Sequence, residues 1–182
     1  MILIYPAALT PAIKIRTAPE PNCPTKCGNI SVPFPFGIGA GCSREAGFNL
    51  YCDSIDKTPA LFFYNTQSEI DGSLVQIELA EGKLKFLPEY MDHSTYSLPS
   101  LIAAGWETRE YQWMIQNKTC IEAQRDIATY ACRSINSICI QAAVRHNPNF
   151  GYRCQCQKGY EGNPYISNGC IGSLLYLLYS IL

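Results

Sequence analysis

Residues 151–160 read GYRCQCQKGY, and this stretch decides the fold of the second half of the chain. Its two cysteines, Cys154 and Cys156, are separated by one residue; Tyr152 stands two positions before the first, and a Gly-Tyr pair follows the second. From Cys120 onward, six cysteines are separated by 11, 6, 14, 1 and 13 residues. Such spacing predicts a small module held by disulfides, because roughly fifty residues cannot bury a sufficient core.

The 182-residue chain has ten cysteines, in a group of four and a group of six separated by residues 53–119. A cytosol rich in glutathione would keep such thiols reduced, so the pattern predicts two disulfide frameworks in an oxidising compartment. Zinc is the alternative, but C-x3-C and C-x-C spacings do not form the paired C-x2-C knuckles of zinc sites. The cysteines are Cys23, Cys27, Cys42, Cys52, Cys120, Cys132, Cys139, Cys154, Cys156 and Cys170. Three connectivities are open for the first four.

Two sequons, Asn29-Ile-Ser31 and Asn117-Lys-Thr119, predict glycosylation at Asn29 and Asn117 and exposure of both segments. Residues 1–19 are a possible signal or leader, although the apolar start lacks basic residues before it and contains two prolines. The apolar tail 171–182 is shorter than the ~20 residues of a spanning helix.

Charge is distributed unevenly although the net charge is only −1, which excludes a strongly basic nucleic-acid binder. Residues 20–92 contain five basic residues against ten carboxylates, a net of −5. Residues 127–160 contain four basic residues and no carboxylate, a net of +4.

The remaining pattern is typical of β structure. Prolines in the stretch 32–37, VPFPFG, exclude a helix there. Residues 74–79 and 83–87 alternate with period two around Ala-Glu-Gly, which predicts a hairpin, and 61–64 and 110–115 are further candidate strands. A helical turn is expected at 121–126. The predicted fold is therefore small, disulfide-rich and mainly β.

The six-cysteine segment resembles an epidermal-growth-factor-like module. The resemblance implies bridges Cys120–Cys139, Cys132–Cys154 and Cys156–Cys170, each adding ~3 kcal/mol of stability. Calcium-binding members have an acidic run before the first cysteine; here residues 116–119 read QNKT, so no calcium, other metal or cofactor is expected.

The first cluster carries a second resemblance. Cys23-x3-Cys27-Gly, the stretch VPFPFG, Gly-Cys42 and FNLYCD at 48–53 resemble the galacturonan-binding module of plant wall-associated receptor kinases, whose ectodomain also contains a growth-factor-like module. The implied organisation is a cysteine-rich module at 20–90, a linker or strand region at 91–115 and the growth-factor-like module at 116–170. Cysteines that the family has around 88–108 are absent, and the chain is interpreted as an ectodomain truncated before the second module, membrane span and kinase that follow in the family.

The resemblance implies binding of pectin, or oligogalacturonide, in the cell wall or at the outer side of the plasma membrane. A polyanion requires cations for its carboxylates and aromatic faces for its rings. The candidates in the first module are Lys26, Phe34, Phe36, Arg44 and Tyr51. The alternative is that the three aromatic residues form the core.

A second candidate surface is the basic segment of the second module. We hypothesise that four cations there form the better anionic face, against the alternative that they are scattered solvated charges. They are Arg133, Arg145, Arg153 and Lys158.

Enzyme chemistry is not expected. The two histidines, His93 and His146, have no free thiol to pair with, the acidic residues are numerous enough to give carboxylate pairs by chance, and no kinase motif is present. The function predicted is polysaccharide binding without catalysis. The alternative is a secreted decoy or regulatory ectodomain with an extracellular protein partner.

Overall fold

A computed structural model describes residues 15–53, 59–63, 72–87, 108–116, 118–144 and 147–173. Several sequence predictions lie outside these residues: Asn117, Arg145 and both histidines, most of the expected leader, most of the 91–115 region and most of the apolar tail. Within the described residues the chain is mainly β, as predicted, with one short α-helix.

The part of the chain up to the end of β8, called the first half below, forms a six-stranded sheet of order β3-β4-β5-β6-β7-β8. Only β3 and β4 run parallel; the other neighbours are antiparallel. The strands are β3 (Gly37–Ile38), β4 (Asn49–Asp53), β5 (Ala60–Phe63), β6 (Ser73–Glu78), β7 (Lys83–Leu87) and β8 (Arg109–Gln112). The β6–β7 hairpin confirms the predicted turn, where Gly82 adopts a φ of 66°.

The segment before β4 covers one side of this sheet. It contains the two-stranded ribbon β1 (Lys26–Cys27) and β2 (Ile30–Ser31) and the 3-10 helix η1 (Ala46–Phe48). The proline-containing stretch is irregular, as its fixed φ angles require. Gly37 is needed here because a Cβ atom would lie 2.2 Å from the Cys42 carbonyl group.

The predicted strand 110–115 is divided in two. The chain leaves the first sheet after β8, and β9 (Ile115–Gln116) pairs with the second sheet. Between them, the backbone N–H of Trp113 donates to the Gly82 carbonyl oxygen at 2.9 Å, and the Trp113 ring is buried. The break therefore arises because Trp113 belongs to the core between two sheets, which a single sequence does not reveal.

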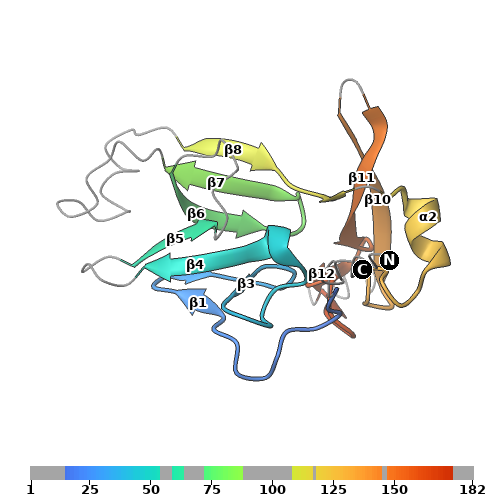
Figure 1. The fold of residues 1–182 in the computed structure, drawn as a ribbon. Helices are drawn as coiled ribbons and strands as arrows, with labels where there is room; N and C mark the ends of the chain where they lie inside the picture. Colours follow the sequence, from blue (N-terminus) through green and yellow to red (C-terminus); the bar gives the residue numbers. More distant parts are fainter. Residues whose placement is uncertain are drawn as a thin grey trace, which may run out of the picture.

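The second half contains α2 (Cys120–Arg125), β10 (Ser137–Val144), β11 (Asn147–Cys156), β12 (Tyr160–Gly162) and β13 (Cys170–Gly172). Figure 1 shows the β10–β11 ribbon standing beside the six-stranded sheet, with α2 on its far side. Thr119 begins the helix with a capping box: its hydroxyl accepts from the Glu122 N–H, and the Glu122 carboxylate accepts from the Thr119 N–H. Gly151 admits β9, because a Cβ there would lie 2.4 Å from the Ile115 carbonyl oxygen.

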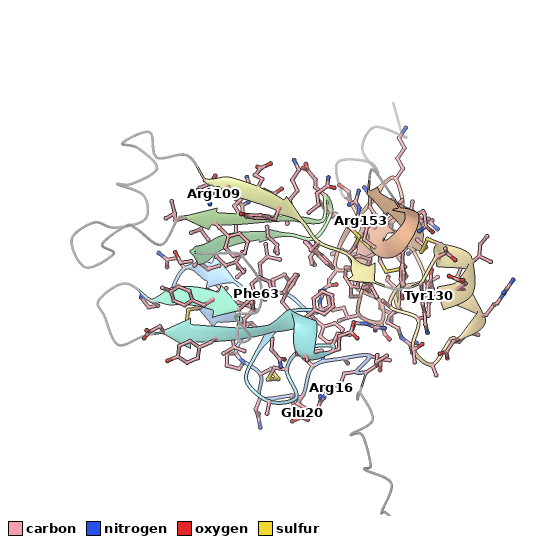
Figure 2. The ribbon with its side chains drawn as sticks, turned by 45° about the horizontal axis from the view of Figure 1, so that its top comes forward. Arg16, Glu20, Phe63, Arg109, Tyr130 and Arg153 are labelled. Carbon is pink, nitrogen blue, oxygen red and sulfur yellow. A yellow bond between two sulfur atoms is a disulfide. The ribbon has the colours of Figure 1, made fainter. Side chains whose placement is uncertain are left out.

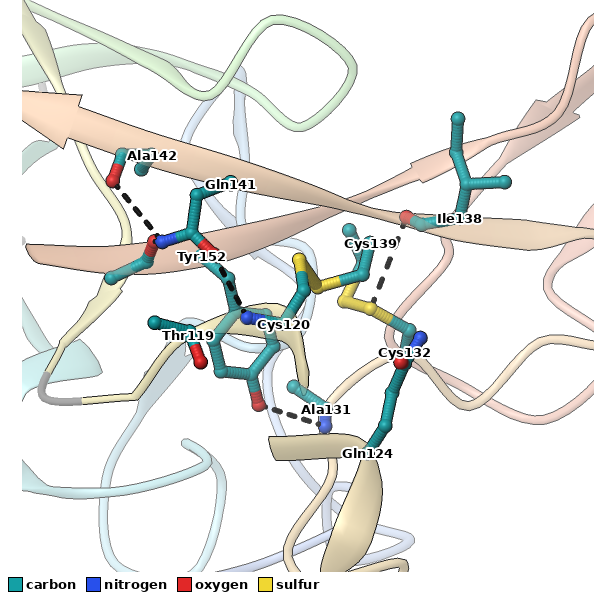
Figure 3. The surroundings of a disulfide bond; sticks show 12 residues. Thr119, Cys120, Gln124, Ala131, Cys132, Ile138, Cys139, Gln141, Ala142 and Tyr152 are labelled. Carbon is teal, nitrogen blue, oxygen red and sulfur yellow. Dashed lines mark hydrogen bonds between the residues drawn. A yellow bond between two sulfur atoms is a disulfide. The ribbon is translucent and has the colours of Figure 1, made fainter. Parts of the chain in front are cut away.

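Five disulfides join the ten cysteines, and none crosses between the two groups. In the first group Cys23 pairs with Cys42 and Cys27 with Cys52, which settles the open connectivity. In the second group the structure has the three bridges that the resemblance implies. Figure 3 shows the Cys120–Cys139 region, where the Gln141 side chain accepts from the Cys120 N–H and the Tyr152 hydroxyl accepts from the Ala131 N–H.

The expectation that disulfides replace a core in each half needs correction, because the halves share one. The Trp113 ring meets Phe36 at 5.0 Å and Phe48 at 5.7 Å on one side and Tyr165 at 5.5 Å on the other, measured between ring centroids. All four side chains are buried. Apolar surface that neither half could bury alone is removed from water where they meet.

Candidate functional site

Three of the sequence-predicted ligand residues are inaccessible. Phe34 and Phe36 lie in the core at 5% and 2% exposure, and Arg44 is 2% exposed. Phe36 packs against Phe48 and Trp113, so its ring has no face left for a sugar. The proposed ligand roles of Phe34, Phe36 and Arg44 are therefore withdrawn, and the alternative that the two aromatic residues form core is confirmed.

Arg44 instead joins the two halves of the molecule. Its Nη2 atom donates to the Thr129 carbonyl oxygen of the second half, and Nη1 donates to the Arg16 carbonyl oxygen at 3.4 Å. Nε lies 3.9 Å from the Glu45 carboxylate. Burial lowers the pKa of Arg44, but a guanidinium stays charged from so high an ordinary value. The Arg44 guanidinium therefore binds groups of the protein itself and is not available to a ligand.

Two further polar contacts cross the same boundary. The Asn163 side chain donates to the Phe34 carbonyl oxygen at 2.7 Å, and Arg153 Nη1 donates to the Ala80 carbonyl oxygen at 2.7 Å. Figure 2 shows Arg153 on the second half of the chain, at the side next to the first sheet. Together with the shared aromatic core, these bonds fix the relative position of the halves.

Lys26 and Tyr51 remain accessible, and each stands next to a residue of the Cys27–Cys52 bridge. Lys26 is exposed on β1 and Tyr51 is 47% exposed on β4. They precede the bridged residues Cys27 and Cys52, whose Cα atoms are 5.7 Å apart. Consecutive Cα atoms are about 3.8 Å apart, so the Cα atoms of Lys26 and Tyr51 are separated by about 13 Å at most.

The basic segment does not form one cluster among its described members. Arg133 donates to the Ile127 carbonyl oxygen at 2.9 Å within the second half, whereas Arg153 faces the first half. Lys158 is exposed in a turn. Arg153 also lines a hollow of about 150 Å³ between the halves, with Glu81, Trp113 and Gln141 among its other walls.

Two lysines that the sequence did not single out lie on the outer face of the sheet. Lys83 contacts Glu81 at 2.8 Å and Glu110 at 3.7 Å, and Lys85 contacts Glu78 at 3.0 Å and Glu110 at 3.7 Å. The hydrogen bonds that Lys83 and Lys85 donate to the carboxylates of Glu81 and Glu78 raise the pKa values of the two lysines. A polyanion would have to displace these carboxylates before it could use either lysine.

Other features of a site are limited in the described part of the chain. Asn29 is exposed in the turn between β1 and β2, a position open to a glycan. Within the same ranges, no cluster of three histidine, cysteine or acidic residues is arranged to hold a metal ion, and no helix is long and apolar enough to cross a membrane.

Comparison with known proteins finds similarity to one family. A family model described as wall-associated receptor kinase galacturonan-binding matches residues 23–85. Wall-associated receptor kinase 3 of Arabidopsis thaliana is 43% identical over 58 residues, which is 32% of this chain and 7% of that protein. Wall-associated receptor kinase 5 of the same species is 36% identical over 159 residues, which is 85% of this chain and 18% of that protein.

The chain spans less than a fifth of the length of either relative. No solved structure matches it.

Proposed function

We propose that this chain, a wall-associated receptor kinase ectodomain, binds acidic wall polysaccharide of the galacturonan class and performs no chemistry on it. The observation that carries the proposal is the match of residues 23–85 to the galacturonan-binding family model. Extracellular or cell-wall placement follows from the homology and is consistent with ten cysteines joined in five disulfides.

The arrangement of the accessible cations favours an extended polyanion as the ligand over a small anion. Lys26 lies on the first half, and Arg133, Arg153 and Lys158 are distributed over the second, while Arg44 is buried. Residues 20–92 carry a net charge of −5, so a polymer gains attraction only by reaching several separated cations. We infer that the ligand is a chain of acidic sugars that contacts both halves of the protein. The shared core holds the two halves in a fixed relative position.

Titration of the oxidised protein with oligogalacturonides tests this function. Affinity should rise with oligomer length, fall as salt is added, and be lost with fully methyl-esterified oligomers, because carboxylates supply the charge. The Lys26→Gln variant should bind more weakly, as should the variant with Gln at Arg133, Arg145, Arg153 and Lys158. Equal affinity for acidic and esterified oligomers would refute the proposal, and shortening of the oligomers would indicate an enzyme.

A protein partner is the second candidate function, favoured by apolar side chains on the second half. Ile127 and Ile135 are 74% and 82% exposed, and Ile121 and Ile171 are also exposed. Single exposed apolar residues are common, so their number on one small module is the argument. Affinity capture from wall extract, compared between wild type and an Ile127→Ser, Ile135→Ser variant, separates this function from polysaccharide binding.

A further inference from the structure

The outer face of β4 and β5 carries two aromatic side chains that the core does not use. Successive side chains of a strand point to opposite faces. Leu50 and Leu61 are buried on the core side, so Tyr51 and Phe62 face the other way. Among the described residues that form the core or pack against it, neither Tyr51 nor Phe62 occurs. Phe63, by contrast, contacts Phe36 and Phe86 on the core side.

Strand register sets these two rings next to each other. Tyr51 and Phe62 are direct partners across the antiparallel β4–β5 pair. Side chains in such a position have Cβ atoms about 4.5–5.5 Å apart. Tyr51 is exposed on this face and Phe62 is half-buried. Farther across the sheet, the outward side chains are instead lysine and glutamate, as is usual for a face in contact with water.

We propose that Tyr51 and Phe62 form a stacking platform for a pyranose ring of the acidic polysaccharide, an inference that rests on the proposed function. A pyranose has an apolar C–H face, which suits the face of an aromatic ring. Asp53 lies on the same face of β4, so the carboxylate of the stacked ring must point away from it.

Stacking has a signature that distinguishes it from charge pairing. The contact excludes water from an apolar surface and involves no ion, so its contribution should not change with salt. Ion pairs between polymer carboxylates and exposed lysines are screened, with a Debye length of about 3 Å at 1 M salt. Covering roughly 40 Å² of ring surface at the usual area coefficient corresponds to about a five-fold change in Kd.

The test is calorimetric titration with one oligogalacturonide at low and at high salt. We expect Tyr51→Ala to weaken binding about five-fold by the same factor at both salt concentrations, and Tyr51→Phe to bind as the wild type does. Lys26→Gln should lose affinity mainly at low salt. Tyr160→Ala is the matched control, since Tyr160 is an exposed tyrosine of the second half and should bind normally.

The outcomes separate the two proposals. A wild type that binds while Tyr51→Ala and Phe62→Leu bind equally well overturns the platform and leaves the proposed function standing. A wild type that does not bind any oligogalacturonide overturns both. If Tyr51→Ala changes the sedimentation coefficient and leaves sugar affinity intact, the face contacts a second copy of the chain, and the platform is again wrong.

Discussion

Replacement of Trp113 by alanine tests the shared core. The ring is 7% exposed and lies 5.0 Å from Phe36, 5.7 Å from Phe48 and 5.5 Å from Tyr165. Truncation of a buried aromatic side chain typically costs about 3–5 kcal/mol of unfolding free energy. Because the residues that contact Trp113 come from both halves of the chain, we expect the substitution to lower the unfolding free energy of the whole molecule by most of this amount.

Guanidinium unfolding with the disulfides intact, followed by circular dichroism, measures the loss. Tyr51→Ala is the control and should change the unfolding free energy by less than about 0.5 kcal/mol, because Tyr51 lies outside the core. Hydrogen exchange at the Cys154 amide, in the second half, adds a site-specific readout and should accelerate in Trp113→Ala. An unchanged unfolding midpoint, or an unchanged Cys154 exchange rate beside a destabilised first half, would refute the reasoning.

Three further predictions concern single groups. Tyr165→Phe should lower the unfolding free energy by about 1–3 kcal/mol. The Cys154 backbone N–H donates to the Tyr165 hydroxyl at 2.8 Å and would be buried without a partner in the variant. A denaturation midpoint equal to that of the wild type would contradict this prediction. Hydrogen bonds from Thr119 lower the pKa of Glu122, so α2 should lose stability as the pH falls through that lowered pKa. The Glu122→Gln variant should show a flatter pH profile of amide exchange in α2. A profile as steep as that of the wild type argues against this prediction. Asn29→Gln should remove one glycan mass from protein secreted by plant cells, and identical intact masses would exclude glycosylation at Asn29.

The parts of the fold that the sequence predicts are those set by local rules. Cysteine spacing indicated two frameworks, and alternation around Ala80-Glu-Gly82 indicated the β6–β7 hairpin, because both signals lie within a few tens of residues. The break at Trp113 was not predicted, since it depends on Phe36 and Tyr165, which are distant in the sequence and meet only in the folded chain.

The candidate site was harder to predict for the same reason. Arg44, two residues after a cysteine and followed by an acidic residue, has the sequence context of a surface cation. Its burial is explained by contacts made in the folded chain, among them its bond to the Thr129 carbonyl oxygen. The sequence does not single out Phe62, because its importance depends on the register that sets it opposite Tyr51. The exposure of Tyr51 itself follows from strand alternation, a signal that was present in the sequence.

Retention on immobilised polygalacturonate is the most direct test of the central claim that a disulfide-stabilised, non-catalytic ectodomain binds acidic polysaccharide. We predict that oxidised protein is retained at low salt and eluted by high salt, that reduced and alkylated protein flows through, and that the polymer keeps its length. Retention of the reduced protein equal to that of the oxidised protein, or no retention of either, would contradict the account.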